Sequence, residues 1–554
     1  MAGLSSLVVM GCAGGGGAPR DAGGGGDVDA GAGLDAGGAV DAGFDAGDPP
    51  DASERLPERC NAELEYFMDE FGRRAYCIFV STDGDDETGD GTVMAPFRTI
   101  GHGVEVAVAQ GAATGNVHAV AVSRGTYEER VELANGISVY GQFDADDMWS
   151  RDPANETIVQ NREVVDGRIE GVVADGISAP TVLEGFTITA RTALVEWRDV
   201  DVYGVRVADS APVVEDLGGL VLRDLTVEAG HAARGSDAEA GAPGDPGVVG
   251  EPGEPGVTSS GDGVTGGRGG AAICQSVTVE ATRGGTGGTS GGDDAMGCGT
   301  YREDAAPGSP PDAAPSCMGG TAGDACSCVS PIDYDGEPGG PGNTCASTAA
   351  SAGAAATAAT TRGEVLDGLW VASPPADGAN GGHGVGGSGG GGGGSGCAAG
   401  GYGPTGGGGG GGGSGGCGGL GGGGGLPGGS SFALFVHASE IAAPGCSFQS
   451  RNGGDGGAAA AGGAGGAGGM GGAGGTGGYA GGLGGTGQAG GDAGAGAGGV
   501  GGSSVGALIC DGDVADLELE SIDAGIGGAG GAAVTGGAPG IDGFESRVLF
   551  DCGF

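Results

Sequence analysis

The stretch that decides the fold is GDGTVMAPFRTI, from Gly89 to Ile100. It joins a Gly-rich turn to a Pro-Phe pair and lies where an irregular beginning gives way to patterned sequence. Pro96 ends any helix that precedes it, because proline lacks a backbone N–H and has a fixed φ. Phe97 offers an apolar plug, and an amphipathic helix is expected after Ile100. The stretch therefore predicts the capped opening of a β structure.

Three short runs with alternating apolar residues follow this opening. They are VHAVAV (117–122), RVELA (130–134) and GISVYGQF (136–143), and Gly or Asn bounds them. An apolar period of two residues is typical of β-strands. Stacked parallel strands form a solenoid in which each rung contacts only its neighbours. The open first rung would leave backbone groups unpaired, so the helix after Ile100 is expected to cover it.

The residues around these runs resemble a known family. GDGTVMAPFRTIGHGVEVA, VAVSRGTYEERVEL and GISVYGQF are similar to the N-terminal section of pectin-lyase-like, right-handed parallel β-helix proteins of bacterial envelopes. The resemblance covers about Val80 to Phe143 and is one of pattern alone beyond that. It implies that the first element feeds a capping helix and the second enters the first rungs. The family fold also hosts polysaccharide lyases and hydrolases, which use clustered Asp residues, often with calcium.

Similar strand-like units recur far along the chain, each ending in a small residue and a Gly tract. We therefore expect an all-β fold, one right-handed parallel β-helix from about Val80 to the C-terminus, with long Gly-rich insertions leaving from one corner. The alternative is a set of unrelated β segments in a disordered Gly matrix. The units are TVLEGFTITA (181–190), GGLVLRDLTVEAG (218–230), GGAAICQSVTVE (269–280), GEVLDGLWVASPPADG (363–378), GCSFQSRNGGDGG (445–457) and GGSSVGALICDGDVADLELESIDAGIGG (501–528).

The insertions are rich in glycine, which makes up 144 of the 554 residues. Residues 241–256, GAPGDPGVVGEPGEPG, have Gly at every third position, which favours an extended polyproline-II segment. Residues 462–487 have a three-residue period with two Gly in most units. Such segments can pack side by side as polyglycine-II helices, but disorder is the favoured interpretation for them. This composition is similar to that of the Gly-rich surface proteins of mycobacteria.

The charge is strongly acidic, with a net charge of −50 from 72 acidic and 22 basic residues, and the chain contains no Lys. Nucleic-acid binding is disfavoured, because neutralising phosphates requires a cationic surface. The loop STDGDDETGDG (81–91) carries the densest group of carboxylates, which suits calcium. The alternative is a solvated turn. The candidate calcium ligands are Asp83, Asp85, Asp86 and Asp90.

The first residues resemble a lipoprotein signal. LSSLVVMGC (4–12) is a short apolar run that ends in small residues before Cys12, as in the lipobox of bacterial lipoproteins. The resemblance implies cleavage before Cys12 and lipidation of that residue. The basic residues that normally precede the run are missing, which leaves open a start further upstream. Residues 13–58 read as a disordered Asp/Ala/Gly tether, 59–230 as the cap and first rungs, and 231–554 as further rungs interrupted by collagen-like, Cys-rich and Gly-rich loops.

The 14 cysteines of this Gly-rich chain indicate an oxidising compartment. Cys60 and Cys77 bracket a segment, Asn61 to Arg74, with the pattern of a short amphipathic helix, and are expected to pair. The alternative is that they are free or metal-binding thiols. Cys397 and Cys417 are expected to tie a Gly loop, whereas Cys274 and Cys510 fall at buried strand positions. Without Cys12 the number is odd, so one thiol is expected to be free or paired between chains. The remaining disulfide candidates are Cys298, Cys317, Cys326, Cys328 and Cys345.

Catalytic residues are not assigned. Arg198, Asp199 and Asp201, or Arg223 and Asp224, project from strand-like segments, but such groups are ordinarily solvated ion pairs. The sequence predicts an exported, lipid-anchored protein of the outer membrane or cell surface, with a structural or adhesive role and contacts to polysaccharide or matrix. The alternatives are a secreted polysaccharide lyase or hydrolase and a calcium-stiffened surface-layer component.

Overall fold

The architecture is given by a computed structural model. It describes residues 60, 67–69, 72–211, 219–257, 262–275, 277–278, 282–291, 304–311, 314, 317–325, 337–345, 349–396 and 404–554. The chain divides into two units, Met1–Arg55 and Leu56–Phe554, and every described residue belongs to the second. Cys12 and the tether lie outside the described residues, as do Cys298, Cys326, Cys328 and Cys397.

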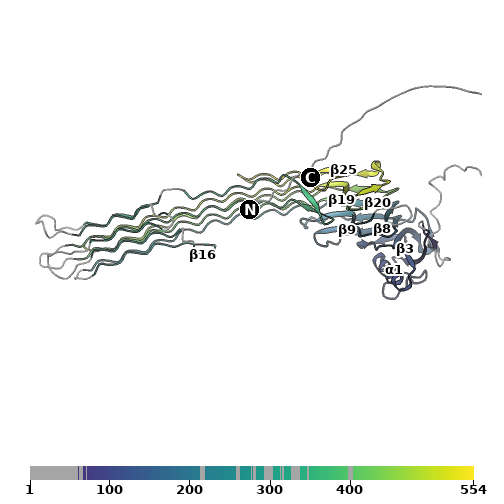
Figure 1. Cartoon of the computed structure of the whole chain (residues 1–554), viewed down its shortest axis with the longest axis horizontal. Coiled ribbons are helices and arrows are strands. Elements are labelled where there is room, and N and C mark those ends of the chain that lie inside the picture. The colour runs from purple at the N-terminus through teal and green to yellow at the C-terminus, as the bar shows by residue number, and fades with distance from the viewer. Residues whose placement is uncertain are drawn as a thin grey trace, which may run out of the picture. The chain divides into compact units, whose positions relative to one another are not determined.

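Three large sheets form the folded core (Figure 1). Sheet 1 has the order β1 (Phe67–Met68), β2 (Arg74–Val80), β3 (Val117–Ser123), β6 (Ser138–Asp144), β10 (Thr181–Glu184), β13 (Leu220–Arg223), β20 (Glu440–Ala442) and β23 (Asp513–Ala515), with β7 (Ser150–Arg151) beside β6. Sheet 2 has the order β4 (Gly125–Tyr127), β8 (Thr157–Asn161), β11 (Thr187–Ala190), β14 (Thr226–Ala229), β21 (Ser447–Ser450) and β24 (Ile522–Asp523). Sheet 3 has the order β5 (Val131–Glu132), β9 (Arg168–Asp175), β12 (Asp201–Ala208), β19 (Ser431–His437), β22 (Ser504–Cys510) and β25 (Glu545–Leu549).

The strand order is that of a parallel β-helix. Successive turns place one strand in each sheet, as β10, β11 and β12 do, and then β13, β14 and β19. All pairs in these sheets are parallel except β1 with β2 and β6 with β7. Inward side chains stack in register, so that Val120 lies opposite Val139 and Leu183 opposite Leu222, all of them buried. The expected fold class is confirmed.

The first rung is covered by the helix α1 (Ile100–Thr114). Ile100, Val104 and Ala107 are buried against the core, and Phe97 lies in the same cluster. Thr99 caps the helix, and the carboxylate of Glu129 accepts hydrogen bonds from the backbone N–H groups of Ile100 and Gly101. The backbone donors of the first turn are thereby satisfied. The predicted capping helix is confirmed.

Three local predictions are wrong. Phe67–Met68 is strand β1, antiparallel to β2, so the described part of Asn61 to Arg74 does not form the expected helix. The units at 269–280 and 363–378 are not rungs. They form separate antiparallel hairpins, β15 (Ile273–Cys274) with β16 (Val277–Thr278), and β17 (Gly363–Leu366) with β18 (Leu369–Ala372). Trp370 of β18 packs on the outer face of sheet 3 against Phe432.

The long insertions leave the β-helix at one corner, between sheet 2 and sheet 3. They run from the end of β14 to β19, from β21 to β22, and from β24 to β25. Each insertion carries extended segments, called arms here, that run out and back side by side (Figure 1). The first outgoing arm is 231–257, the central arm 404–429, the second outgoing arm 451–476 and the second returning arm 481–503. The predicted common corner is confirmed.

The arms are held together by backbone hydrogen bonds with a period of three residues. Gly241 donates to Ala461 O, and the bonds recur at every third residue to Gly256, which donates to Thr476 O. Every third residue of an arm lies on the same side and forms one of three rows. In the central arm all three rows donate hydrogen bonds: Gly408 donates to Glu254 O, Gly409 to Gly288 O and Gly410 to Gly482 O. Three residues per turn without internal hydrogen bonds is the pattern of polyproline-II and polyglycine-II helices. The prediction that favoured disorder for 462–487 is wrong.

Glycine is required at most positions where an arm faces another arm. A Cβ atom on Gly412 would lie 2.0 Å from Gly387 O, and one on Gly457 would lie 1.8 Å from Ser236 O. Rows that face solvent carry side chains instead, as Ala464, Ala467 and Met470 do. The two-in-three glycine pattern thus marks which rows of an arm are covered.

Where a neighbouring arm ends, side chains accept the hydrogen bonds that backbone carbonyls of that arm accept elsewhere. Along one row of the central arm, Gly409, Gly412 and Gly415 donate to backbone carbonyls of 282–288. The next donors in the row bond to side chains, and proline, which has no N–H, follows at 427. These bonds are Gly418 to His383 Nδ1, Gly421 to Asn380 Oδ1 and Gly424 to Asp377 Oδ1. The backbone donors of this row are therefore satisfied.

Candidate functional site

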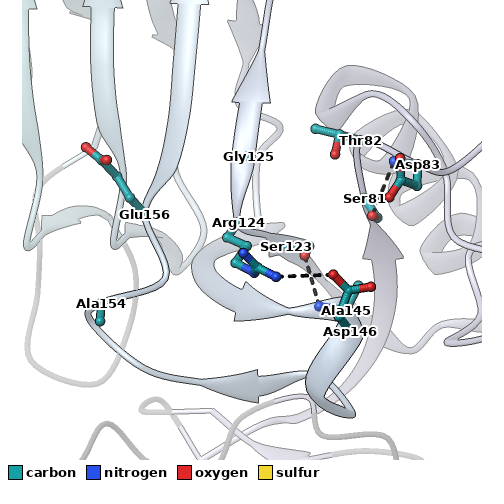
Figure 2. A pocket seen from close by; sticks show the side chains of 10 residues that line it. All are labelled: Ser81, Thr82, Asp83, Ser123, Arg124, Gly125, Ala145, Asp146, Ala154 and Glu156. Atoms are coloured by element: carbon teal, nitrogen blue, oxygen red, sulfur yellow. Dashed lines mark hydrogen bonds and ion pairs between the residues drawn. The ribbon is translucent and has the colours of Figure 1, made fainter.

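A polar pocket of about 400 Å³ lies at a different corner from the insertions, where sheet 1 turns into sheet 2. Its position follows from the solenoid, because β2, β3 and β6 end at successive heights and each is followed by a polar turn. Figure 2 shows the hydroxyl groups of Ser81, Thr82 and Ser123 and the charged groups of Asp83, Arg124, Asp146 and Glu156 around it. The remaining lining residues are Gly125, Ala145 and Ala154.

Arg124 is the cation of this pocket and is held by two carboxylates. Its Nε atom lies 2.9 Å from Asp144 and its Nη2 atom 3.1 Å from Asp146. The hydrogen bond from Arg124 keeps the pKa of Asp144 below its usual value. Glu156 lies across the pocket and accepts a hydrogen bond from Thr187. The pocket therefore offers carboxylate acceptors and hydroxyl groups around a paired guanidinium, which suits a polyhydroxylated ligand.

The acidic loop at the rim of the pocket uses its carboxylates as turn caps. Asp85 accepts hydrogen bonds from the backbone of Glu87 and Thr88, which lowers its pKa. Asp86 Oδ1 accepts from the backbone of Arg98 and Thr99, and its Oδ2 from the Thr99 hydroxyl. Asp90 caps Thr92 in the same way. These bonds account for the local fold of the loop, and calcium binding by Asp83, Asp85, Asp86 and Asp90 stays a prediction.

The Arg and Asp residues that the sequence singled out near 198–201 join the β-helix to the arms. Arg198 donates to the carbonyls of Val195 and Trp197. Asp199 accepts from the backbone and hydroxyl of Ser236, in the first outgoing arm. Asp201 accepts from Ser430 N at 2.6 Å, at the end of the central arm, and burial raises its pKa to about 7. The two carboxylates therefore tie an outgoing and a returning arm to sheet 3.

Two buried carboxylates, each paired with arginines, were not identified from the sequence. Glu184 is 1% exposed and accepts from Arg151 at 2.9 Å and from Arg223 at 3.0 Å. Glu170 is paired in the same manner with Arg206 at 2.7 Å and Arg130 at 2.8 Å. Buried carboxylates persist when opposite charges and hydrogen bonds compensate the lost hydration. Arg223 thus pairs with Glu184, and the pKa of neighbouring Asp224 is raised by burial.

The described cysteines form four disulfides, which indicate an extracytoplasmic protein. The predicted pair Cys60–Cys77 is confirmed. Cys417 pairs with Cys274 rather than with Cys397, because Cys274 lies beside the central arm and not in a rung. The other pairs are Cys317–Cys345 and Cys510–Cys552, so Cys510 is buried as expected but also bonded. Cys446 is a free, buried thiol whose pKa burial raises to about 12.

Two groups of possible metal ligands converge among the described residues. They are Cys274, His383 and Cys417, and His437, Cys510 and Asp511. In both groups the cysteines belong to disulfides, so their sulfurs are not thiolate ligands. His383 Nδ1 also accepts the hydrogen bond from Gly418. Neither group therefore carries a metal assignment.

The comparisons with known proteins add little to this picture. No protein-family model and no curated protein matches the chain. One solved structure, a GH136 lacto-N-biosidase from Eubacterium ramulus, aligns with 27% of this chain and 27% of its own, at 14% identity and a TM-score of 0.20. A likeness this distant carries no argument about activity. Within the part of the chain that the structure describes, no helix has the length and hydropathy needed to cross a bilayer.

Proposed function

We propose that the protein is a surface protein of the cell envelope that displays a rigid array of glycine arms on a β-helix scaffold. A lipid on Cys12 holds it at the membrane, and residues 13–58 act as the tether. The array serves a structural or adhesive role and contacts polysaccharide or extracellular matrix. The alternative from the sequence, a secreted polysaccharide lyase or hydrolase, has one supporting feature: the polar pocket gathers Asp83, Asp146 and Glu156.

The observation that carries this proposal is the bonding of the arms. The rows of the central arm that face other arms are mostly bare glycine, with Ser414, Cys417, Leu420 and Leu426 as exceptions, and their backbone groups bond to neighbours on all sides. The central arm, 404–429, spans about 80 Å at ~3.1 Å per residue. Bonded, extended backbone of this length holds the far ends of the arms at a distance from the β-helix. A catalytic role would not require it.

The composition of the exposed rows supports display on a surface. They carry Ala, Thr, Pro, Asp and Glu, and the net charge of −50 keeps such surfaces soluble and mutually repelling. Four disulfides tie the scaffold in a compartment where reductants are scarce.

The test is the cellular location of a Cys12→Ser variant. The wild type is expected in the membrane fraction, released by detergent but not by salt, and Cys12→Ser is expected in the soluble or secreted fraction. Gly11→Ala is the matched control, because it keeps a small residue before the cysteine and should stay anchored. Retention of Cys12→Ser in the membrane would overturn the anchor. Depolymerisation of a glycan by the purified protein, lost on Glu156→Gln, would favour the enzyme instead.

A further inference from the structure

The first outgoing arm presents prolines in a single exposed row. Pro243, Pro246, Pro252 and Pro255 recur at three-residue spacing, with Val249 completing the row, and all five residues are exposed. The glycines between them, such as Gly244 and Gly253, face the bundle, where a Cβ atom would meet backbone oxygens at 2.1 and 2.0 Å. One row of the helix thus faces the bundle, and the side chains of the other two rows are exposed.

This arm is fixed in the extended conformation by its neighbours. Gly244, Gly247, Gly250 and Gly253 donate in turn to carbonyls of the second outgoing arm, from Ala464 to Ala473. On the other side, Cys417, Ser414 and Gly411 donate to carbonyls of Asp245, Val248 and Glu251. Free proline-rich peptides must be ordered on binding, and this arm is already ordered.

The row of prolines repeats once per turn, every ~9 Å for a polyproline-II helix. Pro243 with Pro246, and Pro252 with Pro255, each form a Pro-x-x-Pro pair on one edge. Grooves lined by aromatic side chains recognise such pairs by packing against two of the three helix rows. The adjoining exposed row carries Asp245, Glu251 and Glu254, so the rim of a matching groove would be basic. The carboxylates of Glu251 and Glu254 also accept hydrogen bonds from the backbone of Arg268 and Thr265, whereas Asp245 lies beyond that segment.

We propose that residues 242–255 are a docking surface for a partner protein with an aromatic-lined, basic-rimmed groove that binds polyproline-II helices. From 242 to 249 the glycine row faces the bundle and the side chains of the other two rows are exposed, whereas Glu251 and Glu254 also bond to residues 265–268. This partner adds to the display function proposed above and rests on it. The binding experiment uses purified protein in solution, so its failure and a failure of the membrane anchor are separate results.

A second property of proline must be distinguished from docking. Proline lacks a backbone N–H, so a row of prolines at the edge of the bundle exposes no unpaired donors. A purely protective role predicts that Pro→Ala substitutions change edge exposure and self-association but not the binding of a groove. The docking role predicts that the same substitutions weaken binding while the arm keeps its hydrogen bonds, because neither Pro243 nor Pro246 donates one.

The experiment measures binding of the full chain to immobilised SH3, WW and EVH1 domains, chosen as pairs with basic and acidic groove rims. Binding to basic-rimmed domains is expected, weakened about tenfold for each of Pro243→Ala and Pro246→Ala through lost ring contacts. Val249→Pro should tighten it, because Val249 donates no hydrogen bond to a described residue. Pro307→Ala is the matched control and should bind as wild type, since its partner Pro310 is half-buried.

Three results would overturn the proposal. They are no binding to any of these domains, binding that Pro243→Ala and Pro246→Ala leave unchanged, and equal binding to acidic-rimmed domains. Amide exchange across 241–256 in each variant shows whether the arm is intact. A loss of binding accompanied by a loss of protection there would also count against docking and favour the protective role. Sedimentation velocity separates groove binding from self-association through this row.

Discussion

A single methyl group placed between two arms should disrupt the bundle, and the same arm supplies its own control. Gly469 lies in the second outgoing arm, and a Cβ atom there would lie 2.2 Å from Val248 O in the neighbouring arm. Ala467, two residues earlier, faces solvent. We therefore expect Gly469→Ala to be destabilising and Ala467→Ser to be neutral, although both changes add one heavy atom to the same arm.

The magnitude follows from the bonds around Gly469. Its N–H donates to Ser414 O, and the flanking bonds Gly247 to Ala467 O and Gly250 to Met470 O join the two arms that must separate. Relieving a 2.2 Å contact moves the arms apart by more than 1 Å, which breaks about three bonds. At about 1 kcal/mol each, the loss is about 3 kcal/mol. A lower entropy of the unfolded chain returns about 0.4–1 kcal/mol. The net effect is about 2–3 kcal/mol of local stability.

Amide hydrogen exchange read by mass spectrometry is the appropriate assay, because the arms are nearly free of aromatic reporters. Peptides from 462–476 and 241–256 should lose protection by about 30- to 150-fold in Gly469→Ala, the factor that 2–3 kcal/mol represents. Peptides from β3 and β6 should be unchanged. Equal protection in Gly469→Ala and Ala467→Ser would refute the close packing of the arms and the reason given for the glycine pattern.

Two further outcomes concern the β-helix. The pKa of Asp201 is raised to about 7 from an ordinary value of 3.8, so the folded state holds its proton more tightly than the unfolded state. This contribution to the free energy of unfolding is fully present below about pH 4 and is lost as the pH rises through 7. Asp201→Asn should therefore be more stable than the wild type at pH 8, by about 2–4 kcal/mol, and equally stable near pH 4, as measured by urea titration. A variant that is less stable than the wild type at pH 8 would contradict the burial of this charge. Cys446, with its pKa near 12, should resist iodoacetamide at pH 8 in the native protein and react on unfolding in urea, as read by mass spectrometry at the peptide that contains residue 446. Cys446→Ser is the control that lacks the label at this position. Rapid labelling of Cys446 in the native protein would show that the rung around Phe448 opens readily.

Much of the β-helix could be predicted from local patterns. The period-two runs at 117–122 and 136–143 became β3 and β6, and the Pro96-Phe97 pair precedes the capping helix, because each of these signals depends on residues close in the chain. The same pattern misassigned 273–278 and 363–372, since a short alternating run pairs equally well with its own hairpin partner or with a rung. The helix expected over Asn61 to Arg74 failed for a related reason. Phe67 is buried on the outer face of sheet 1 as part of a strand, and tertiary packing overrode the local pattern.

For the candidate site too, some features could be predicted from the sequence and others could not. The acidic loop at 81–91 was visible in the sequence, but the pocket beside it unites residues from β3, β4 and the segments after β2 and β6, which only stacking brings to one corner. Glu184 and Glu170 were missed because nothing in their strands marks the arginines that reach them from other rungs. The partner of Cys417 was wrong because separation along the chain says little about distance when the arms run back past one another.

The amino-acid sequence by itself determined most of the strand units, the common corner from which the insertions leave, and the three-residue period of the insertions. This period also fixed which rows must stay bare, since a covered row of an arm admits no side chain larger than hydrogen at most positions. Only the tertiary structure decided that these glycine segments are ordered, and which arm lies beside which. Glycine carries no side chain with which to select a neighbour. Backbone hydrogen bonds between arms exist only once both have been brought together by the stacked rungs that hold their ends.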